Sequence, residues 1–281
     1  MSTPKGTVVV TGAASGIGRA TALRLARNGH RVLAGVRRES DGSELASAAP
    51  AGTLEAVLLD VTDAAHLAAL GERLAGLPLT GLVNNAGIAV TGPLEAVDLD
   101  ELRRQFEVNL VGQVAVTQAA LPALRAGVGR IVNVGSIGGR VGPPFLGPYA
   151  SSKGALRTLT AALRRELAPW GLHVALIEPG AIDTEIWRKG LDGADEQLAA
   201  LPERARELYG PQMQALREAT VKIADGAIPA ERVARDIEHA LTAARPRTLY
   251  TVGTEARVQG ALQALLPARV LDRVIARAMG L

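Results

Sequence analysis

A glycine-rich turn between a short strand and a helix constrains this chain more than any other feature of its sequence. Residues 7–10 form a β-branched run typical of a buried strand, and the segment Thr11-Gly12-Ala13-Ala14-Ser15-Gly16-Ile17-Gly18 follows directly. A helical pattern then runs over residues 17–27 and ends at Asn28-Gly29. Glycines in such a turn let the backbone approach a pyrophosphate, whose charge is favoured at a helix N-terminus. The pattern predicts a dinucleotide-binding loop, whose expected contacts are Gly12, Ser15, Gly16, Ile17 and Gly18.

Strand-like and helical segments alternate along the first two thirds of the chain. Further strands are expected at residues 31–36, 54–59, 82–83, 130–134 and 173–178, and helices at 64–74, 99–124 and 152–167. Such alternation is typical of a parallel sheet covered by helices on both faces.

The alternation ends after residue 184. The pattern is helical or irregular over 185–226 and helical over 229–244, with a last strand at 248–252 and an apolar, Arg-rich stretch at 255–281 that Pro267 divides. No linker separates these parts, so we expect a single α/β domain over residues 1–281. Within it, 6–184 is the expected cofactor-binding and catalytic core, 185–226 a helical insertion over the site and 247–281 a C-terminal extension.

Composition excludes several classes of protein. The 281 residues carry a net charge of only +3 and seven aromatic side chains (two Phe, two Trp and three Tyr), which is too little for a nucleic-acid surface. With no cysteine there is no disulfide framework or Cys metal site, and none of the four histidines has ligand spacing. The sequence has no apolar run of about 18 residues and no secretory signal pattern, so we expect a cytoplasmic protein that binds no metal.

Two segments at the ends of expected strands carry candidate binding residues. Arg37 and Arg38 follow the second strand, where a carboxylate would grip ribose hydroxyls and an Arg suits a 2′-phosphate. Asn84-Asn85-Ala86-Gly87 ends the fourth strand, at the edge where parallel sheets bind ligands. Two solvated arginines and an ordinary turn remain the alternatives when each segment is read alone.

The candidate chemistry lies in Tyr149 and Lys153, which a helical i, i+4 spacing places on one face. A phenol is a weak base at neutral pH, and a nearby ammonium lowers its pKa, which makes it an acid/base group for alcohol and carbonyl chemistry. Ser136 follows the fifth strand, where its hydroxyl can hold a carbonyl oxygen. Asn109 lies within an apolar helix, where Asn is unfavourable for stability.

Together these segments resemble the short-chain dehydrogenase/reductase family. The matching residues occur in the family's order and spacing over about residues 6–184, and they are the 11–18 loop, Asn84–Gly87, Asn109, Ser136, Tyr149, Lys153 and Pro179-Gly180-Ala181-Ile182-Asp183-Thr184. Gly135 departs from the family, which often has Ser there. The resemblance implies a Rossmann-type, doubly wound parallel sheet and hydride transfer with NAD(P)(H). Non-catalytic NAD(P)-binding redox regulators and nucleotide-sugar epimerases are the alternatives.

The resemblance also implies a role for each matching residue. Tyr149 is the expected general acid/base, Ser136 holds the substrate oxygen, Lys153 binds the nicotinamide ribose and lowers the pKa of Tyr149, and Asn109 bends its helix and holds a relay water. The further cofactor contacts that it implies are Asp60, Val61, Asn85, Ala86, Gly87, Pro179, Gly180, Ile182 and Thr184. Arg37 and Arg38 favour NADP(H) over NAD(H).

The remaining expectations concern substrate and partners. Apolar residues of the 185–226 segment, together with Phe145, Ile186 and Trp187, predict a pocket for a hydrophobic alcohol or carbonyl compound. The tail more loosely resembles the steroid- and retinol-type branch of the family. The long helices at 99–124 and 152–167 favour a homodimer or homotetramer. An apolar stripe in 268–281 beside three arginines is interpreted as packing on this chain or a second copy, with a membrane surface as the less favoured alternative.

Overall fold

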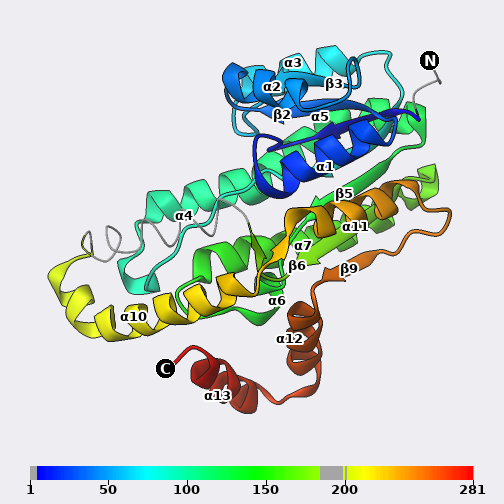
Figure 1. The fold of residues 1–281 in the computed structure, drawn as a ribbon. Coiled ribbons are helices and arrows are strands. Elements are labelled where there is room, and N and C mark those ends of the chain that lie inside the picture. The colour runs from blue at the N-terminus through cyan, green and yellow to red at the C-terminus, as the bar shows by residue number, and fades with distance from the viewer. Residues whose placement is uncertain (1–4, 184–198, 200, 281) are drawn as a thin grey trace.

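The computed structural model describes residues 5–183, 199 and 201–280, and within them seven parallel strands form one sheet (Figure 1). The strands are β1 (Thr7–Val10), β2 (Arg31–Val36), β3 (Leu54–Leu58), β4 (Leu79–Asn84), β5 (Arg130–Val134), β6 (His173–Pro179) and β9 (Leu249–Val252). Their order across the sheet is β3-β2-β1-β4-β5-β6-β9. The order reverses between β1 and β4, so the carboxyl ends of these two strands form the crevice where such sheets bind ligands.

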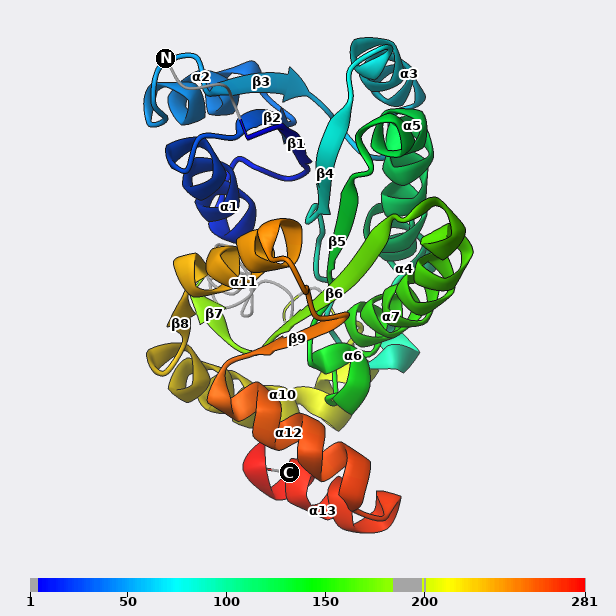
Figure 2. The same ribbon diagram turned by 90° about the vertical axis from the view of Figure 1, so that its right-hand side faces the viewer.

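Helices cover both faces of the sheet, as Figure 2 shows. One face packs against α1 (Gly16–Arg27), α2 (Glu39–Ser47) and α11 (Ala230–Thr242), and the other against α3 (Ala64–Leu74), α5 (Gly112–Gly127) and α7 (Gly147–Leu167). The period-two alternation of strand side chains explains this: Val8 and Val10 of β1 belong to the first core, and Val9 belongs to the second. The predicted doubly wound sheet is confirmed.

Shorter elements and a helical C-terminal part complete the fold. The short elements are η1 (Leu94–Ala96), α4 (Leu99–Phe106), the π-helical turn η2 (Glu107–Val111), α6 (Gly138–Val141), η3 (Ala168–Trp170) and the paired strands β7 (Ile182–Asp183) and β8 (Ile228–Pro229). The C-terminal helices are α10 (Glu203–Asp225), α12 (Thr254–Leu265) and α13 (Ala268–Ala278), which lie together at one end of the molecule (Figures 1 and 2). None of the helices in the described part of the chain is long and apolar enough to cross a membrane.

Several elements differ from the sequence prediction. The helix expected over 99–124 is divided by the π-helical turn and continues to Gly127. The helix expected from residue 152 begins at Gly147, because Pro148 is tolerated in the first turn, where its missing N–H would have no partner. Helix α2 was not predicted, because Gly42 interrupts a weakly helical Ser-rich segment. Pro267 separates α12 from α13, as predicted.

Candidate active site

Two loops meet at the switch point of the sheet, where the glycine-rich turn touches the end of β4. Gly12 has a φ of +62°, and a Cβ there would lie 2.8 Å from the Cα of Ala86. A Cβ on Gly18 would lie 2.1 Å from the carbonyl oxygen of Gly12. Asn85 Nδ2 donates to the carbonyl oxygens of Thr11 and Gly12 over 3.0 and 3.1 Å. Glycine is therefore required at both positions, and the turn packs as a phosphate-binding turn must.

Thr11 fixes the two loops against each other through its hydroxyl. Its Oγ1 accepts hydrogen bonds from the backbone N–H groups of Asn85 and Ala86, over 2.9 and 3.0 Å. Thr11 is fully buried, so these bonds satisfy an oxygen that would otherwise be costly to bury. The loop geometry thus depends on Thr11, which belongs to the glycine-rich motif but was not among its expected cofactor contacts.

Ser136, Tyr149 and Lys153 surround one small cavity at the carboxyl end of β5. The cavity has a volume of about 80 Å³, and its lining residues are Ile17, Asn85, Gly87, Ile88, Val134, Gly135, Ser136, Tyr149, Lys153, Pro179, Gly180 and Ile182. Ser136 and Tyr149 are joined by a side-chain hydrogen bond. Lys153 Nζ donates to the carbonyl oxygen of Val134 over 2.8 Å. Residues from five separate motifs of the sequence are brought together here.

Burial sets the electrostatics of this cavity. Burial raises the pKa of Tyr149, and the hydrogen bond with Ser136 opposes that rise only in part. The Lys153 ammonium is also buried, and desolvation lowers its pKa to about 8. The pKa of Tyr149 was expected to fall through the neighbouring lysine. In this structure it shifts the other way, because burial has the larger effect and Lys153 Nζ lies 5.9 Å from the centre of the ring.

Asn109 lies in the π-helical turn and points at the loop that follows β4. Its Oδ1 accepts from the N–H of Ile88 over 2.8 Å, and its Nδ2 donates to the carbonyl oxygen of Ile88 over 3.0 Å. Gly87 lies between two of the predicted side chains, since a Cβ there would be 3.3 Å from Asn109 Oδ1 and 3.5 Å from Lys153 Nζ. The expected bend at Asn109 takes the form of a π-helical turn, a feature frequent at functional sites.

The predicted contacts for the adenosine end lie beyond β2 and β3. Arg37 and Arg38 are both exposed, and Arg38 forms a two-pronged ion pair with Asp41 over 2.9 and 3.0 Å. Burial raises the pKa of Asp60, but hydrogen bonds from the N–H and hydroxyl of Thr62 outweigh it, so the net shift is downward. Asp60 therefore stays ionised at the edge of the crevice.

A model of the short chain dehydrogenase family matches residues 6–194. The chain belongs to this family. A short-chain dehydrogenase is an oxidoreductase that interconverts a CH–OH group and a carbonyl with NAD(P)(H), and this is the activity of the chain.

Similar proteins cover almost the whole of this short-chain dehydrogenase. It is 35% identical over 275 residues to the NADPH-dependent 3-dehydrocapnine reductase of Ornithobacterium rhinotracheale, covering 95% of this chain and 94% of the relative. It is 35% identical over 282 residues to retinol dehydrogenase 5 of Mus musculus, covering 95% and 87%. A short chain dehydrogenase from Burkholderia cenocepacia in complex with NADP is similar in structure, with a TM-score of 0.75 at 27% identity, covering 97% and 98%.

Not every predicted pocket residue of this short-chain dehydrogenase lies at the cavity. Phe145 is absent from the lining that the described residues provide; its ring meets Tyr209 of α10 edge-on, with centroids 6.1 Å apart. A φ of +62° at Phe145, unusual for a bulky residue, accompanies this placement of the ring. Thr184, Ile186 and Trp187 lie outside the described residues.

The cavity also contains residues that sequence reasoning missed. Ile88 and Val134 line it, and both directly adjoin segments that the sequence did single out. Gly135 lines it as well, and a Cβ there would lie 3.0 Å from Leu176 Cδ1 and 3.2 Å from the carbonyl oxygen of Ile177. A serine at this position would require its neighbours to shift, which accounts for glycine in place of the family's frequent serine.

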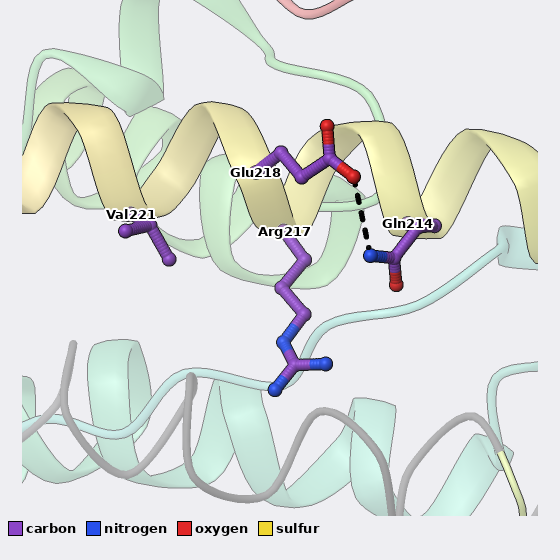
Figure 3. Close-up of a pocket in the computed structure, with 4 residues that line it drawn as sticks. All are labelled: Gln214, Arg217, Glu218 and Val221. Carbon is purple, nitrogen blue, oxygen red and sulfur yellow. Dashed lines mark hydrogen bonds between the residues drawn. The ribbon is translucent and has the colours of Figure 1, made fainter.

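A larger hollow of about 410 Å³ lies along α10, and its described lining shares no residue with the cavity beside Tyr149. Its described lining is Gln214, Arg217, Glu218 and Val221, and Figure 3 shows the hydrogen bond of 3.3 Å from Gln214 Nε2 to Glu218 Oε1. All four lie in the 185–226 segment whose apolar residues were expected to line a substrate pocket, but only Val221 among them is apolar, and none carries the predicted acid/base chemistry. The small cavity beside Tyr149 is therefore the candidate active site.

Proposed function

We propose that the enzyme interconverts a hydrophobic primary or secondary alcohol and its aldehyde or ketone, with NADP(H) favoured over NAD(H). One observation carries the assignment: Ser136, Tyr149 and Lys153 line the same cavity, beside the dinucleotide turn. An ionisable phenol, a hydroxyl hydrogen-bonded to it and a buried ammonium are the groups that acid/base chemistry on a carbonyl oxygen needs.

Each of these side chains has a separate role in the proposal. Tyr149 donates a proton to the carbonyl oxygen in reduction and removes it from the alcohol in oxidation. Ser136 holds the same oxygen, since its hydroxyl already bonds to the phenol. Lys153 binds the hydroxyls of the nicotinamide ribose, since its buried ammonium lines the cavity beside Tyr149. Asn109 holds the Ile88 backbone, and we retain for it the proton relay towards Lys153.

The residues present fit a dinucleotide. Gly12 and Gly18 pack so closely within the turn and against Asn85 and Ala86 that a Cβ would clash at either position, and a tight glycine turn at the start of a helix is what a pyrophosphate site needs. The residues that would hold the cofactor are Gly12, Ser15, Gly16, Ile17, Gly18, Arg37, Arg38, Asp60, Val61, Asn85, Ala86, Gly87, Tyr149, Lys153, Pro179, Gly180, Ile182 and Thr184. When bound, the nicotinamide supplies or accepts the hydride.

The preference for NADP(H) rests on Arg37 and Arg38. No carboxylate ends β2, and the exposed guanidinium of Arg37 offers donors in the geometry that a phosphate accepts. Asp41 already pairs with Arg38, so Arg37 is the stronger candidate for a 2′-phosphate. A relative that is named NADPH-dependent and a similar structure in complex with NADP support the same preference.

A hydrophobic substrate agrees with the apolar part of the site. Ile17, Ile88, Val134 and Ile182 line the cavity, and the Phe145–Tyr209 contact joins the loop before Tyr149 to α10. Ile186 and Trp187 remain candidate pocket residues from the sequence. Similarity to retinol dehydrogenases supports an apolar substrate.

We also propose a homodimer or homotetramer that associates through α4, α5 and α7. Leu99 of α4 and Val111 of the π-helical turn are 60% and 48% exposed, and a second copy would cover these two apolar side chains. For the tail we favour packing over contact with a membrane surface, since Leu271 of α13 is buried and Gly280 lies against Ala215 of α10.

A substrate screen tests the function. Purified protein is incubated with NADPH and hydrophobic ketones or aldehydes, and with NADP⁺ and the matching alcohols, and the nicotinamide absorbance band is followed. We expect turnover of apolar compounds and little of small polar ones. A protein that binds NADPH but turns over no compound in either direction would contradict the proposal.

A further inference from the structure

We propose that Gln105 is a positioning residue of the active site: with Asn109 it clamps the Ile88–Val90 backbone to the helix that carries Tyr149. The inference rests on the proposed function for its catalytic consequence, but the clamp itself is a property of the folded chain. Gln105 is the last residue but one of α4, and its side chain is fully buried.

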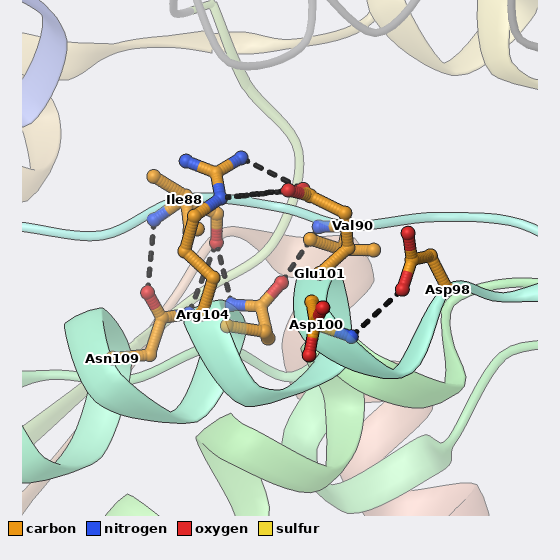
Figure 4. Close-up of polar contacts among 8 residues, drawn as sticks. Ile88, Val90, Asp98, Asp100, Glu101, Arg104 and Asn109 are labelled. Carbon is orange, nitrogen blue, oxygen red and sulfur yellow. Dashed lines mark hydrogen bonds and ion pairs between the residues drawn. The ribbon is translucent and has the colours of Figure 1, made fainter.

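The amide of Gln105 bonds on both sides to the loop after β4. Its Oε1 accepts from the N–H of Val90 over 2.6 Å, and its Nε2 donates to the carbonyl oxygen of Ile88 over 2.9 Å. Asn109 bonds to the N–H and the carbonyl oxygen of Ile88. Figure 4 shows these hydrogen bonds at Ile88 and Val90, above the helix that carries Asn109. Two amides four residues apart therefore hold three backbone groups of one loop.

The same two amides reach the catalytic helix through Ser152. Asn109 Nδ2 donates to Ser152 Oγ over 3.1 Å, and Gln105 Nε2 lies 3.5 Å from the same oxygen. Ser152 Oγ in turn donates to the carbonyl oxygen of Tyr149 over 2.7 Å. Ser152 itself is fully buried and directly precedes Lys153. The loop and α7 are thus tied through one buried hydroxyl.

This clamp borders the cavity directly. Ile88 lines the cavity together with Tyr149 and Lys153, so a shift of the loop moves one of its walls. Asn109 bonds only to Ile88 within the loop, whereas Gln105 also holds Val90. Without Gln105 the loop keeps its contact at Ile88 and loses its contact two residues later.

Stability alone would favour an apolar residue at this position. Burying an amide is costly unless its donors and acceptor are satisfied, and a residue such as Leu has a similar helix propensity without that cost. The outer side of α4 gives little compensation, because the Glu101–Arg104 and Asp100–Arg103 pairs are exposed and such pairs contribute little. Figure 4 shows Arg104 and Glu101 paired, and Asp98 capping the helix at Asp100. The amide of Gln105 therefore contributes through its hydrogen bonds to the loop after β4.

Hydrogen exchange and kinetics on the full chain test the clamp. Gln105→Met keeps the length of the side chain but removes all its amide bonds, and Leu70→Ala, in the core between α3 and the sheet, serves as the control of general destabilisation. In Gln105→Met we expect peptides spanning residues 86–95 to exchange about 10-fold faster than in wild type. The control variant leaves exchange in that segment unchanged relative to its other peptides.

The kinetic arm separates positioning from binding. With a substrate found in the screen, we expect kcat of Gln105→Met to fall about 10- to 100-fold, because small displacements at a site are costly to turnover. The Kd for NADPH, measured by fluorescence, stays close to the wild-type value. The control variant keeps kcat at temperatures where it is folded.

The two measurements test the role of Gln105 separately from the proposed function. Should Gln105→Met fail to fold, Gln105→Leu, which also removes the bonds to Val90 and Ile88 and introduces no buried charge, replaces it with the same expectation. Unchanged exchange over 86–95 in a folded variant overturns the clamp, and an unchanged kcat overturns the positioning role of Gln105 in the active site. If wild type turns over no alcohol or carbonyl compound, the proposed function fails, and the exchange measurement still confirms or overturns the clamp.

Discussion

At the scale of the residue, Tyr149 is the side chain whose hydroxyl the proposed chemistry cannot lose. Tyr149→Phe removes only that hydroxyl, so we expect kcat to fall by about 10²- to 10⁴-fold while NADPH still binds. Tyr250→Phe is the matched control, because the Tyr250 hydroxyl bonds to His239 and the N–H of Arg247, away from the cavity. Steady-state kinetics and cofactor titration on both variants check this; near-wild-type turnover in Tyr149→Phe contradicts the mechanism.

Burial of Lys153 makes the free energy of unfolding rise with pH in the alkaline range. Burial lowers its pKa from 10.5 to about 8, so the cost of the buried ammonium is fully present below pH 8. Between pH 8 and 10.5 the unfolded chain binds more protons, and the free energy of unfolding rises with pH. The rise amounts to about 3 kcal/mol.

Denaturant unfolding at several pH values tests this dependence. We expect the stability of wild type relative to Lys153→Met to increase between pH 8 and 10, since the variant has no ammonium to titrate. Lys5→Met, which removes an exposed lysine, provides the control. Curves for wild type and Lys153→Met that stay parallel over this interval exclude the expected titration.

Cofactor preference is also decided by single residues. Arg37→Asp replaces an exposed guanidinium with a carboxylate, which repels a 2′-phosphate and suits ribose hydroxyls, so we expect kcat/KM to shift from NADP(H) towards NAD(H) by 10-fold or more. Val36 is the less suitable position, because it is buried in the core and a carboxylate there would destabilise the fold.

The control for cofactor preference makes the same change in charge elsewhere. Arg269→Asp replaces an exposed arginine on α13 and should leave the ratio of kcat/KM values unchanged. A wild-type enzyme that prefers NAD(H), or an Arg37→Asp variant with the wild-type ratio, contradicts the proposed role of Arg37.

At the scale of the element, the sequence predicts whether most segments are helices or strands, but it does not predict where a helix is interrupted or begins. The strands of the sheet were predicted because short β-branched runs bounded by turn residues are typical of buried strands. The apolar period of residues 99–124 is continuous and gives no sign of the π-helical turn; only the family resemblance predicted a bend at Asn109. At the π-helical turn, Asn109 forms hydrogen bonds with the backbone of Ile88. Ile88 lies in a loop distant in sequence, so the local pattern does not show this contact.

Helix α2 is an element that local helix propensity did not predict. Gly42 lowers its helix propensity, yet a Cβ there would lie 2.6 Å from Ala56 Cβ on β3. Close packing against the sheet requires this glycine, and tertiary contact outweighs local preference. Gln105 was missed for a related reason, since only the folded loop shows what its amide binds. Motifs that are recognised by their residue types and their order along the chain are therefore predictable from the sequence. Side chains that support those motifs through tertiary contacts, such as Gln105, are not.

At the scale of the whole molecule, the exposed apolar side chains of Leu99 and Val111 predict association. We expect light scattering at micromolar concentration to give a multiple of the 29.1 kDa chain mass. Leu99→Lys, at a position 60% exposed, should reduce the mass towards the monomer without lowering the melting temperature of the subunit. Val258→Lys, on exposed α12, is the control. A monomeric wild-type chain contradicts the proposed oligomer.

The C-terminal helix α13 presents two apolar rows, and only one of them packs on the chain. Leu271 is buried, and Gly280 lies against Ala215 of α10. Val270 and Val274 are exposed by 40% and 41% beside the exposed Arg269. Burying one aliphatic side chain contributes about 1.5–3 kcal/mol, a substantial part of a domain's net stability of about 5–15 kcal/mol.

Removal of residues 268–281 therefore has different consequences for the two interpretations of the tail. If α13 packs on its own chain, the truncated protein melts at a lower temperature and is less soluble, while its Kd for NADPH changes little, since α13 lies outside the cavity lining. A membrane-surface role instead leaves the melt unchanged and removes binding to anionic liposomes, because a basic amphipathic helix is then lost. We expect the first result, from the burial of Leu271. A thermal melt and liposome sedimentation on the same truncation decide between them, and an unchanged melt with lost liposome binding would reverse our preference.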